Sequence, residues 1–219
     1  RSALNITTIL FDLDGTLIDS SKCIYTVYEQ LFSELGLEMP PQEERRKLIG
    51  PPVETTMKRF LTDGFKEAAD RFRAIYLTVD LSATNVLYDG ITEALRELKR
   101  QGKRLFVATS KSEPVAKTIL ELMNVADYFD AIYGNNAVDR MHKAEVLEAL
   151  FSECGISKEE SILIGDTVFD AEGAAECGIK TGIVNYGFGR KEDFGKYREG
   201  IAFFADKAEQ IPLLIGELN

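Results

Sequence analysis

Three short runs of consecutive apolar residues predict strands that are buried on both faces. They occupy residues 9–11, 105–108 and 162–164, and each is followed directly by polar residues. A strand with one face in solvent alternates apolar and polar side chains, whereas an inner strand of a parallel sheet does not. The three runs therefore predict the centre of a parallel sheet, with polar side chains at the ends of its strands.

Between and after these runs the apolar residues recur every three or four positions, at residues 91–98, 115–122 and 146–154. This spacing is typical of one face of a helix, and Gly102 and Gly155 mark two of the helix ends. Two more strands are expected near residues 181–184 and 201–204, followed by a closing helix at about 208–218. Strands that alternate with helices predict an α/β fold, a Rossmann-like three-layer core around a central parallel sheet.

Residues 20–84 interrupt the alternation, because they contain helical apolar stripes and no clear strand. One stripe runs from Ile24 to Leu35 and stops at Gly36, and two further helices are expected at residues 53–61 and 65–79. Gly50-Pro51-Pro52 forms a turn between helices. We therefore predict an α-helical cap domain at residues 20–84, inserted into a core made of residues 1–19 and 85–219.

Composition narrows the classes of function. Hydrophobic residues make up 45% and charged residues 28% of the 219 residues, which is ordinary for a globular protein. The formal charge of −10 argues against nucleic acid as a partner but not against a small phosphorylated metabolite, which needs only a local positive site. The three cysteines lack CxxC spacing, and neither a long apolar run nor an export signal is present, so a cytoplasmic protein without a membrane partner is expected. The pattern does not distinguish a monomer from a weak homodimer.

Two carboxylates follow the first predicted strand, in the segment DLDGT at residues 12–16. Alternation along a strand sends Asp12 and Asp14 to the same side, and Gly15 allows a tight turn close to a ligand. Adjacent carboxylates repel each other unless a cation lies between them. A DxD pair also occurs in loops that cap helices and in metal-binding glycosyltransferases, so the pair alone leaves the chemistry open.

A second acidic segment, GDTVFD at residues 165–170, follows the strand at residues 162–164. Asp166 lies at a strand end that corresponds to that of Asp12, which favours convergence on one hard cation such as magnesium. Asp170 fits the first turn of a helix, where a carboxylate also caps backbone N–H groups.

Candidate residues for anion binding and charge compensation are Thr109, Ser110 and Lys143. Thr109 and Ser110 end the strand at residues 105–108 and precede a helix, an arrangement that binds anions but is also an ordinary helix cap. Lys143 lies near the start of a helix, where a cation is mildly disfavoured by the helix dipole. A solvated lysine is the default, but Lys143 would compensate the charge of a site that holds up to four carboxylates.

The order of these four features resembles the haloacid dehalogenase superfamily. The segment DxDGT, a strand that ends in Thr or Ser, a lone Lys and the segment GDxxxD follow one another as they do there. The helical insertion after the first motif, with IGPP at residues 49–52, RMHKAEV at 140–146 and YGFG at 186–189, resembles the phosphoglycolate phosphatase-like subclass.

The resemblance implies a role for each residue. Asp12 would be the nucleophile that carries a phosphoryl group, and Asp14 would be the general acid and base. Mg²⁺ would be held by Asp12, the backbone carbonyl of Asp14 and Asp166, with Asp170 in support. The resemblance assigns phosphoryl contacts to Thr109, Ser110 and Lys143. Substrate contacts are expected at Gly15, Thr16 and Arg140, and also at Gly50 and Pro51, whose stiff, compact turn would face the substrate but fits a mere connector between helices equally well.

The implied function is a Mg²⁺-dependent phosphatase that acts on a small phosphate monoester and is phosphoglycolate phosphatase-like. A 5′-nucleotidase, a pyrophosphatase and a β-phosphoglucomutase of the same superfamily stay open as alternatives. A haloacid dehalogenase lacks the second carboxylate of DxD, so Asp14 and Asp166 argue against it, and no lysine of the insertion stands out as a phosphonatase amine. Outside enzymes, a phosphate-accepting regulatory module would keep the acidic cluster, but the large insertion argues against it.

Overall fold

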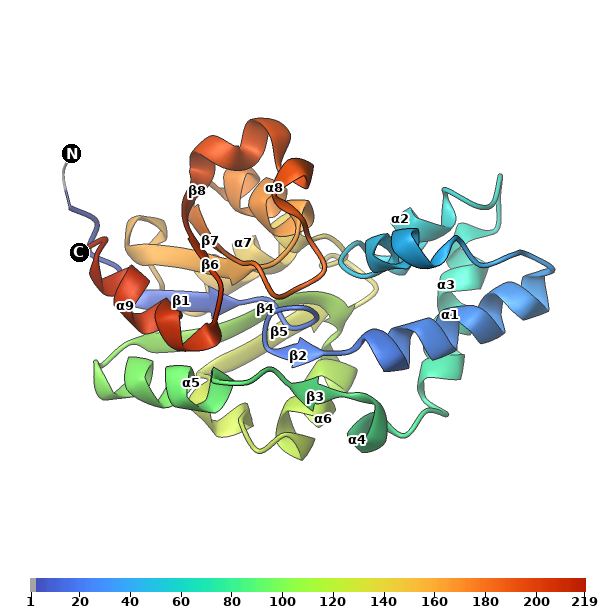
Figure 1. Cartoon of the computed structure of the whole chain (residues 1–219), viewed down its shortest axis with the longest axis horizontal. Coiled ribbons are helices and arrows are strands. Elements are labelled where there is room, and N and C mark those ends of the chain that lie inside the picture. The colour runs from blue at the N-terminus through green and yellow to red at the C-terminus, as the bar shows by residue number, and fades with distance from the viewer. Residues whose placement is uncertain (1–2) are drawn as a thin grey trace.

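The structure is a computed structural model that describes residues 3–219, so the first two residues of the predicted core lie outside the described residues. Its main sheet has six parallel strands in the order β5-β4-β1-β6-β7-β8 (Figure 1). These strands are β1 (Thr8–Phe11), β4 (Arg104–Ser112), β5 (Ala131–Asn135), β6 (Ser161–Gly165), β7 (Lys180–Val184) and β8 (Ile201–Ala205). The predicted α/β fold with a central parallel sheet is confirmed.

Helices cover both faces of this sheet. One face carries α5 (Ile91–Arg100), α6 (Glu113–Leu122) and α9 (Ile211–Gly216), and the other carries α7 (Lys143–Glu153) and α8 (Val168–Cys177). The alternation of β1 explains both cores: Ile9 and Phe11 pack toward α5 and α6, while Leu10 packs toward α7 and α8. All four residues of β1 are buried, as the uninterrupted apolar run predicted.

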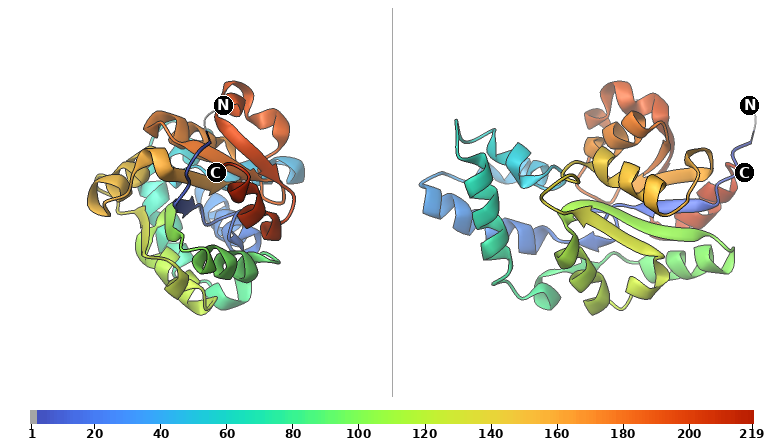
Figure 2. Two further views of the ribbon diagram at one scale, coloured as in Figure 1. Left: turned by 90° about the vertical axis from the view of Figure 1, so that its left-hand side faces the viewer. Right: turned by 180° about the vertical axis from the view of Figure 1, so that it is seen from behind.

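The helical insertion consists of α1 (Ser21–Leu35), the 3₁₀ helix η1 (Gln42–Leu48), α2 (Val53–Met57), α3 (Phe65–Tyr76) and α4 (Leu81–Thr84). It lies beyond the sheet, at the end opposite the C-terminal helix α9 (Figures 1 and 2). Its apolar stripes form a core of their own, in which Tyr28 and Phe32 of α1 pack with Phe72 of α3. Helix α1 ends at Gly36, whose left-handed conformation (φ 67°) closes the last turn.

Several boundaries differ from the sequence prediction. A two-stranded antiparallel ribbon of β2 (Ile18–Asp19) and β3 (Val86–Leu87) joins the insertion to the core, and neither strand was predicted. Strand β5 was not predicted either, because it is only partly buried and Gly134 interrupts its apolar pattern. Helices α2 and α3 stop at Met57 and Tyr76, earlier than expected, because tight turns follow each of them. The closing helix is the short 3₁₀ helix η6 (Ala208–Gln210) followed by α9.

Four shorter 3₁₀ helices complete the chain: η2 (Ala126–Tyr128), η3 (Lys158–Glu160), η4 (Lys191–Asp193) and η5 (Gly195–Gly200). Among residues 3–219, none of the helices combines the length and apolar character that a bilayer crossing requires.

We predict that the central strand β6 contributes strongly to stability. Leu163 is fully buried, so Leu163→Ala should lower the free energy of unfolding by about 2–5 kcal/mol through lost contacts and a residual cavity. The same change at Leu213, which is 66% exposed on α9, should alter it by no more than about 0.5 kcal/mol. Urea denaturation followed by circular dichroism measures both values, and equal losses would contradict the assignment of the core.

Candidate active site

Asp12 is fixed at the end of β1 by a buried lysine from another element. Its side chain is only 8% exposed, and its Oδ1 accepts hydrogen bonds from the backbone N–H of Leu13 at 2.8 Å and from Lys143 Nζ at 2.8 Å. Lys143 Nζ also donates to the carbonyl oxygen of Ala108 at 2.6 Å. Because Asp12 has the same parity along the strand as Leu10, it points toward the face that carries α7, whose first residue is Lys143.

A glycine in α8 makes room for this lysine. A Cβ atom built at Gly173 would lie 2.6 Å from Lys143 Cγ, which is closer than real Cβ contacts. Helices α7 and α8 therefore approach closely enough to bury the Lys143 stem between them, and its charge can reach the strand ends.

Asp166 and Asp170 form the second acidic part of the site. Asp166 follows β6, and its two carboxylate oxygens accept hydrogen bonds from Thr16 Oγ1 at 3.3 Å and from the backbone N–H of Phe188 at 2.9 Å. Asp170 Oδ2 accepts from the backbone N–H groups of Asp166 and Thr167, and its Oδ1 lies 3.2 Å from Lys143 Nζ. Asp170 is thus both a helix cap and part of the charged cluster, the two roles considered from the sequence.

The carboxylates shift one another's protonation. Burial, and then the neighbouring Asp170 carboxylate, raise the pKa of Asp12 to about 7, although Lys143 lowers it. Burial, followed by the charges of Asp170 and Asp12, also raises the pKa of Asp166. Burial by itself lowers the pKa of Lys143, but the charges of Asp12 and Asp170 outweigh it and raise that pKa. The cluster therefore holds more negative charge than one ammonium group compensates.

Asp14 lies on the other side of Asp12 and has its own cationic partner. Lys111 Nζ, from the end of β4, is 3.1 Å from Asp14 Oδ1 and donates to the hydroxyl of Tyr76 at 2.5 Å. Tyr76 is the last residue of α3 in the insertion, so this contact joins the helical insertion to the sheet. Burial alone lowers the pKa of Lys111, but the Asp14 charge outweighs it and raises that pKa.

A cavity of about 150 Å³ opens above Asp12 and Asp14, between the sheet and the insertion. Thr109, Ser110 and Lys111 line its floor at the end of β4, and residues 48–53 of the insertion line the opposite wall. The two carboxylates that follow β1 therefore face a cavity that is bounded on one side by the helical insertion.

The acidic cluster suits a hard divalent cation. Each of Asp12, Asp166 and Asp170 can offer one oxygen within 4.8 Å of the others, and oxygen donors are what Mg²⁺ prefers. The four carboxylates and the two ammonium groups of Lys143 and Lys111 leave a formal charge of −2, which one divalent cation balances. The donor set and the charge both fit the predicted ion.

Comparison with known proteins identifies the family. The family model described as haloacid dehalogenase-like hydrolase matches residues 9–184. The chain belongs to this family. The predicted superfamily and the predicted class of enzyme, a hydrolase of the phosphatase type, are thereby confirmed.

Among similar proteins, the tyrosine-protein kinase PtkA of Mycobacterium tuberculosis is 32% identical over 210 residues, which cover 95% of this chain and 72% of that protein. The phosphoglycolate phosphatase of Aquifex aeolicus is 36% identical over 183 residues, 82% of this chain and 85% of that protein. A crystal structure described as a predicted phosphatase from Clostridium acetobutylicum is 31% identical and superposes with a TM-score of 0.88, covering 99% of this chain and all of that one.

The structure brings together most of the residues of this hydrolase that the sequence analysis selected. Asp12, Asp14, Thr109, Ser110, Gly50 and Pro51 line the cavity, while Lys143, Asp166 and Asp170 lie around Asp12. The Asp14 carboxylate lies against Lys111 and is not part of the cluster of side chains that could hold a metal; the expected role of its backbone carbonyl stays a prediction.

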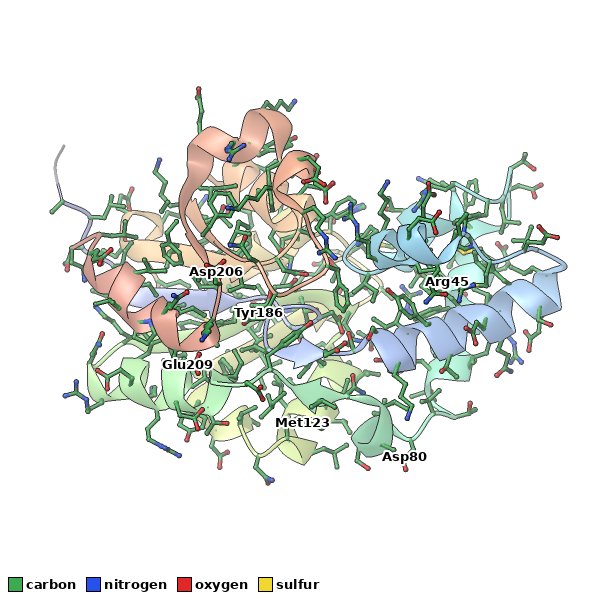
Figure 3. All side chains as sticks on the ribbon, viewed as in Figure 1. Arg45, Asp80, Met123, Tyr186, Asp206 and Glu209 are labelled. Atoms are coloured by element: carbon green, nitrogen blue, oxygen red, sulfur yellow. The ribbon has the colours of Figure 1, made fainter. Side chains whose placement is uncertain are left out.

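Three of the residues that the sequence analysis selected for substrate contact do not line the cavity. Gly15 and Thr16 lie behind Asp166 and not on the cavity wall: a Cβ atom at Gly15 would meet Asp166 Oδ2, and Thr16 donates to its other oxygen. Tyr186, labelled in Figure 3, donates to the Thr16 carbonyl at 2.6 Å and fixes this loop. Arg140 pairs with Glu113 at 3.2 Å and lies over the Tyr133 ring, so its guanidinium is held outside the cavity. The structure therefore places these residues outside the lining of the cavity, and their expected substrate contacts stay predictions.

Lys111 and Tyr76 are the functional candidates that the sequence did not reveal. Lys111 stands directly after Thr109 and Ser110 in a segment already selected, but an exposed lysine is the default for any single position. Tyr76 gave no signal beyond its place in an apolar helical stripe. Lys111 and Tyr76 meet only because the insertion packs over the strand ends, so their contact could not be predicted from the sequence.

The raised pKa values predict a pH dependence of stability in the absence of metal. A carboxyl whose pKa is higher in the folded than in the unfolded protein stabilises the fold while it is protonated, and this contribution is lost as the pH rises from about 4 to about 7. With a chelator present, the cluster should therefore contribute less to the free energy of unfolding at pH 8 than at pH 5. Addition of Mg²⁺ should restore the stability at pH 8. Thermal unfolding at both pH values measures this, and Asp12→Asn should reduce the difference; an unchanged difference in that variant would contradict the assignment.

Proposed function

We propose that this hydrolase is a Mg²⁺-dependent phosphatase that cleaves a small phosphate monoester through an aspartyl phosphate on Asp12. The observation that carries the proposal is the fixed carboxylate of Asp12 at the floor of the cavity, held by Lys143 and flanked by Asp166 and Asp170. A carboxylate in such surroundings is positioned for attack on phosphorus.

In the first half-reaction one carboxylate oxygen of Asp12 forms a bond to phosphorus while the bond to the ester oxygen breaks. Asp14 gives a proton to the departing alcohol oxygen, which leaves Asp14 ionised. In the second half-reaction Asp14 takes a proton from water, the water oxygen attacks phosphorus, and Asp12 is regenerated. The ion pair with Lys111 at 3.1 Å holds the Asp14 side chain at the cavity where both transfers occur.

The remaining polar groups hold the phosphoryl group. Lys143, with its Nζ 2.8 Å from Asp12 Oδ1, would balance negative charge on the equatorial oxygens, and the Thr109 hydroxyl and the Ser110 N–H would bind them from the end of β4. The ion would be held by Asp12, the Asp14 carbonyl and Asp166, with Asp170 in support. When bound, Mg²⁺ supplies charge that stabilises the transferring group.

We also propose that residues 20–84 act as the cap domain over a core of residues 1–19 and 85–219. The helices of the insertion share their own apolar core, and the ribbon of β2 and β3 connects it to the sheet next to the site. Closure of a lid excludes water from the phosphoryl group, and opening releases the product. The core treats all phosphate monoesters alike, so phosphoglycolate, a nucleotide, a sugar phosphate and pyrophosphate are distinguished by the cap.

Metal removal tests the proposed cofactor. Hydrolysis of p-nitrophenyl phosphate should fall to background in a chelator and return with Mg²⁺, because four carboxylates around the phosphoryl group repel it without a cation. Ca²⁺ should fail to restore turnover, since it takes more ligands at longer distances. Full activity in excess chelator would rule out the mechanism.

Substitution of Asp12 and of Asp14 separates their catalytic roles. Asp12→Asn should remove turnover of every ester, whereas Asp14→Asn should slow alkyl esters by roughly 10²–10⁴-fold and aryl esters less, because an aryl leaving group needs less protonation. The same change at Asp127, which is exposed in η2, is the matched control and should leave the rate unchanged. Substantial turnover by repurified Asp12→Asn would contradict the assignment of the nucleophile.

A further inference from the structure

The wall of the cavity that faces away from the phosphoryl site is apolar and partly aromatic. Tyr28 of α1 and Phe72 and Tyr76 of α3 form a row, with ring centroids 4.6 Å apart in the first pair and 5.9 Å apart in the second. Leu48, Val53 and Leu77 of the insertion complete this wall. A leaving group that enters the cavity therefore meets mainly aliphatic and aromatic side chains on this wall.

The cations of the cavity already have partners. Among the described residues that line it, the basic side chains are Arg73 and Lys111. Arg73 Nη2 lies 2.8 Å from Glu54 Oε1, and Lys111 Nζ lies 3.1 Å from Asp14 Oδ1. A carboxylate or second phosphate on the leaving group would compete with Glu54 or Asp14 for these cations, and loss of the partner costs most at the nearly buried pair of Lys111 and Asp14.

Aliphatic and aromatic side chains make up most of the lining of this cavity. Apolar cavities lined by such side chains bind a benzene-sized ring in other proteins. Aromatic rings attract one another beyond the apolar area that they bury, so a ring in contact with Tyr28, Phe72 or Tyr76 would be favoured over a small anion.

We propose that the phosphate ester hydrolysed here has a leaving group with a flat, largely apolar ring, either an aryl group or a nucleobase, and not a small anionic acid. The inference rests on the proposed phosphatase function and names the substrate class of the same site. Phe72, at the centre of the aromatic row, is the residue that determines this specificity most directly.

The test compares four esters whose leaving groups are all primary alcohols, so that leaving-group acidity does not dominate the rates. These are benzyl phosphate, uridine 5′-monophosphate, phosphoglycolate and ethyl phosphate, each assayed with the full chain and Mg²⁺. At least one of the two ring esters should exceed both phosphoglycolate and ethyl phosphate in kcat/KM by about tenfold or more, because apolar contact with the ring is realised only there. Preference for benzyl phosphate or for the nucleotide identifies which source of the ring the cavity accepts.

The outcomes separate the two proposals. Phosphoglycolate or ethyl phosphate hydrolysed as fast as both ring esters would overturn the inference and leave the phosphatase function standing. Absence of Mg²⁺-dependent hydrolysis of every phosphate ester, p-nitrophenyl phosphate included, would overturn the phosphatase function and the inference with it.

A pair of variants tests the role of the aromatic row. Phe72→Ala should lower the ratio of ring-ester to ethyl-ester kcat/KM by about tenfold, mainly through KM. Phe60 lies in the same apolar core of the insertion, packed on Phe32 at 4.9 Å and away from the cavity wall, so Phe60→Ala should keep the wild-type ratio. An unchanged ratio in Phe72→Ala would overturn the assignment of Phe72. If Phe72→Ala does not fold, product inhibition of the wild type decides: benzyl alcohol or uridine should inhibit and glycolate should not, and the reverse order would overturn the inference.

Discussion

The site depends on the buried ammonium group of Lys143. It lies 2.8 Å from Asp12, 3.2 Å from Asp170 and 2.6 Å from the Ala108 carbonyl, so it ties together the ends of β1 and β4 and the start of α8. Without this charge, Asp12 and Asp170 would repel each other in a place where little solvent is present to screen them. The burial of Lys143 requires a glycine at position 173, because any side chain there would occupy the space of the Lys143 stem.

Topology explains why residues from distant parts of the sequence meet at this lysine. Strand β1 lies between β4 and β6, and the carboxyl ends of parallel strands meet at one edge of the sheet. Asp12 and Asp166 directly follow β1 and β6, and Thr109 lies in the last part of β4, which ends at Ser112. The sheet therefore supplies the acidic and hydroxyl groups from its strand ends, and helix α7 supplies the compensating charge from its first residue.

The same topology decided what could be predicted from the sequence. Strands β1, β4 and β6 are buried on both faces, so their apolar runs were visible, whereas β2 and β3 have two residues each and carry no periodicity. The convergence of Asp12 and Asp166 was predicted from their positions after two strands, whereas Lys143 was selected only as a compensating charge and through the family resemblance. The placement of Lys111 against Tyr76, and of Arg140 away from the cavity, depends on how separate elements pack, and such contacts have no local sequence signal.

The helical insertion contacts both halves of the acidic site, and this links its position to the geometry of the site. On one side, the Tyr76 hydroxyl accepts the hydrogen bond from Lys111, which pairs with Asp14. On the other side, Arg46 of η1 pairs with Asp193 at 2.8 Å and donates to the Phe188 carbonyl, while the N–H of Phe188 donates to Asp166. If the insertion moved away from the sheet, Lys111 and the Phe188 loop would each lose a partner in the same step. The surroundings of Asp14 and Asp166 therefore both depend on the position of the insertion, because the contacts come from helices that share one apolar core.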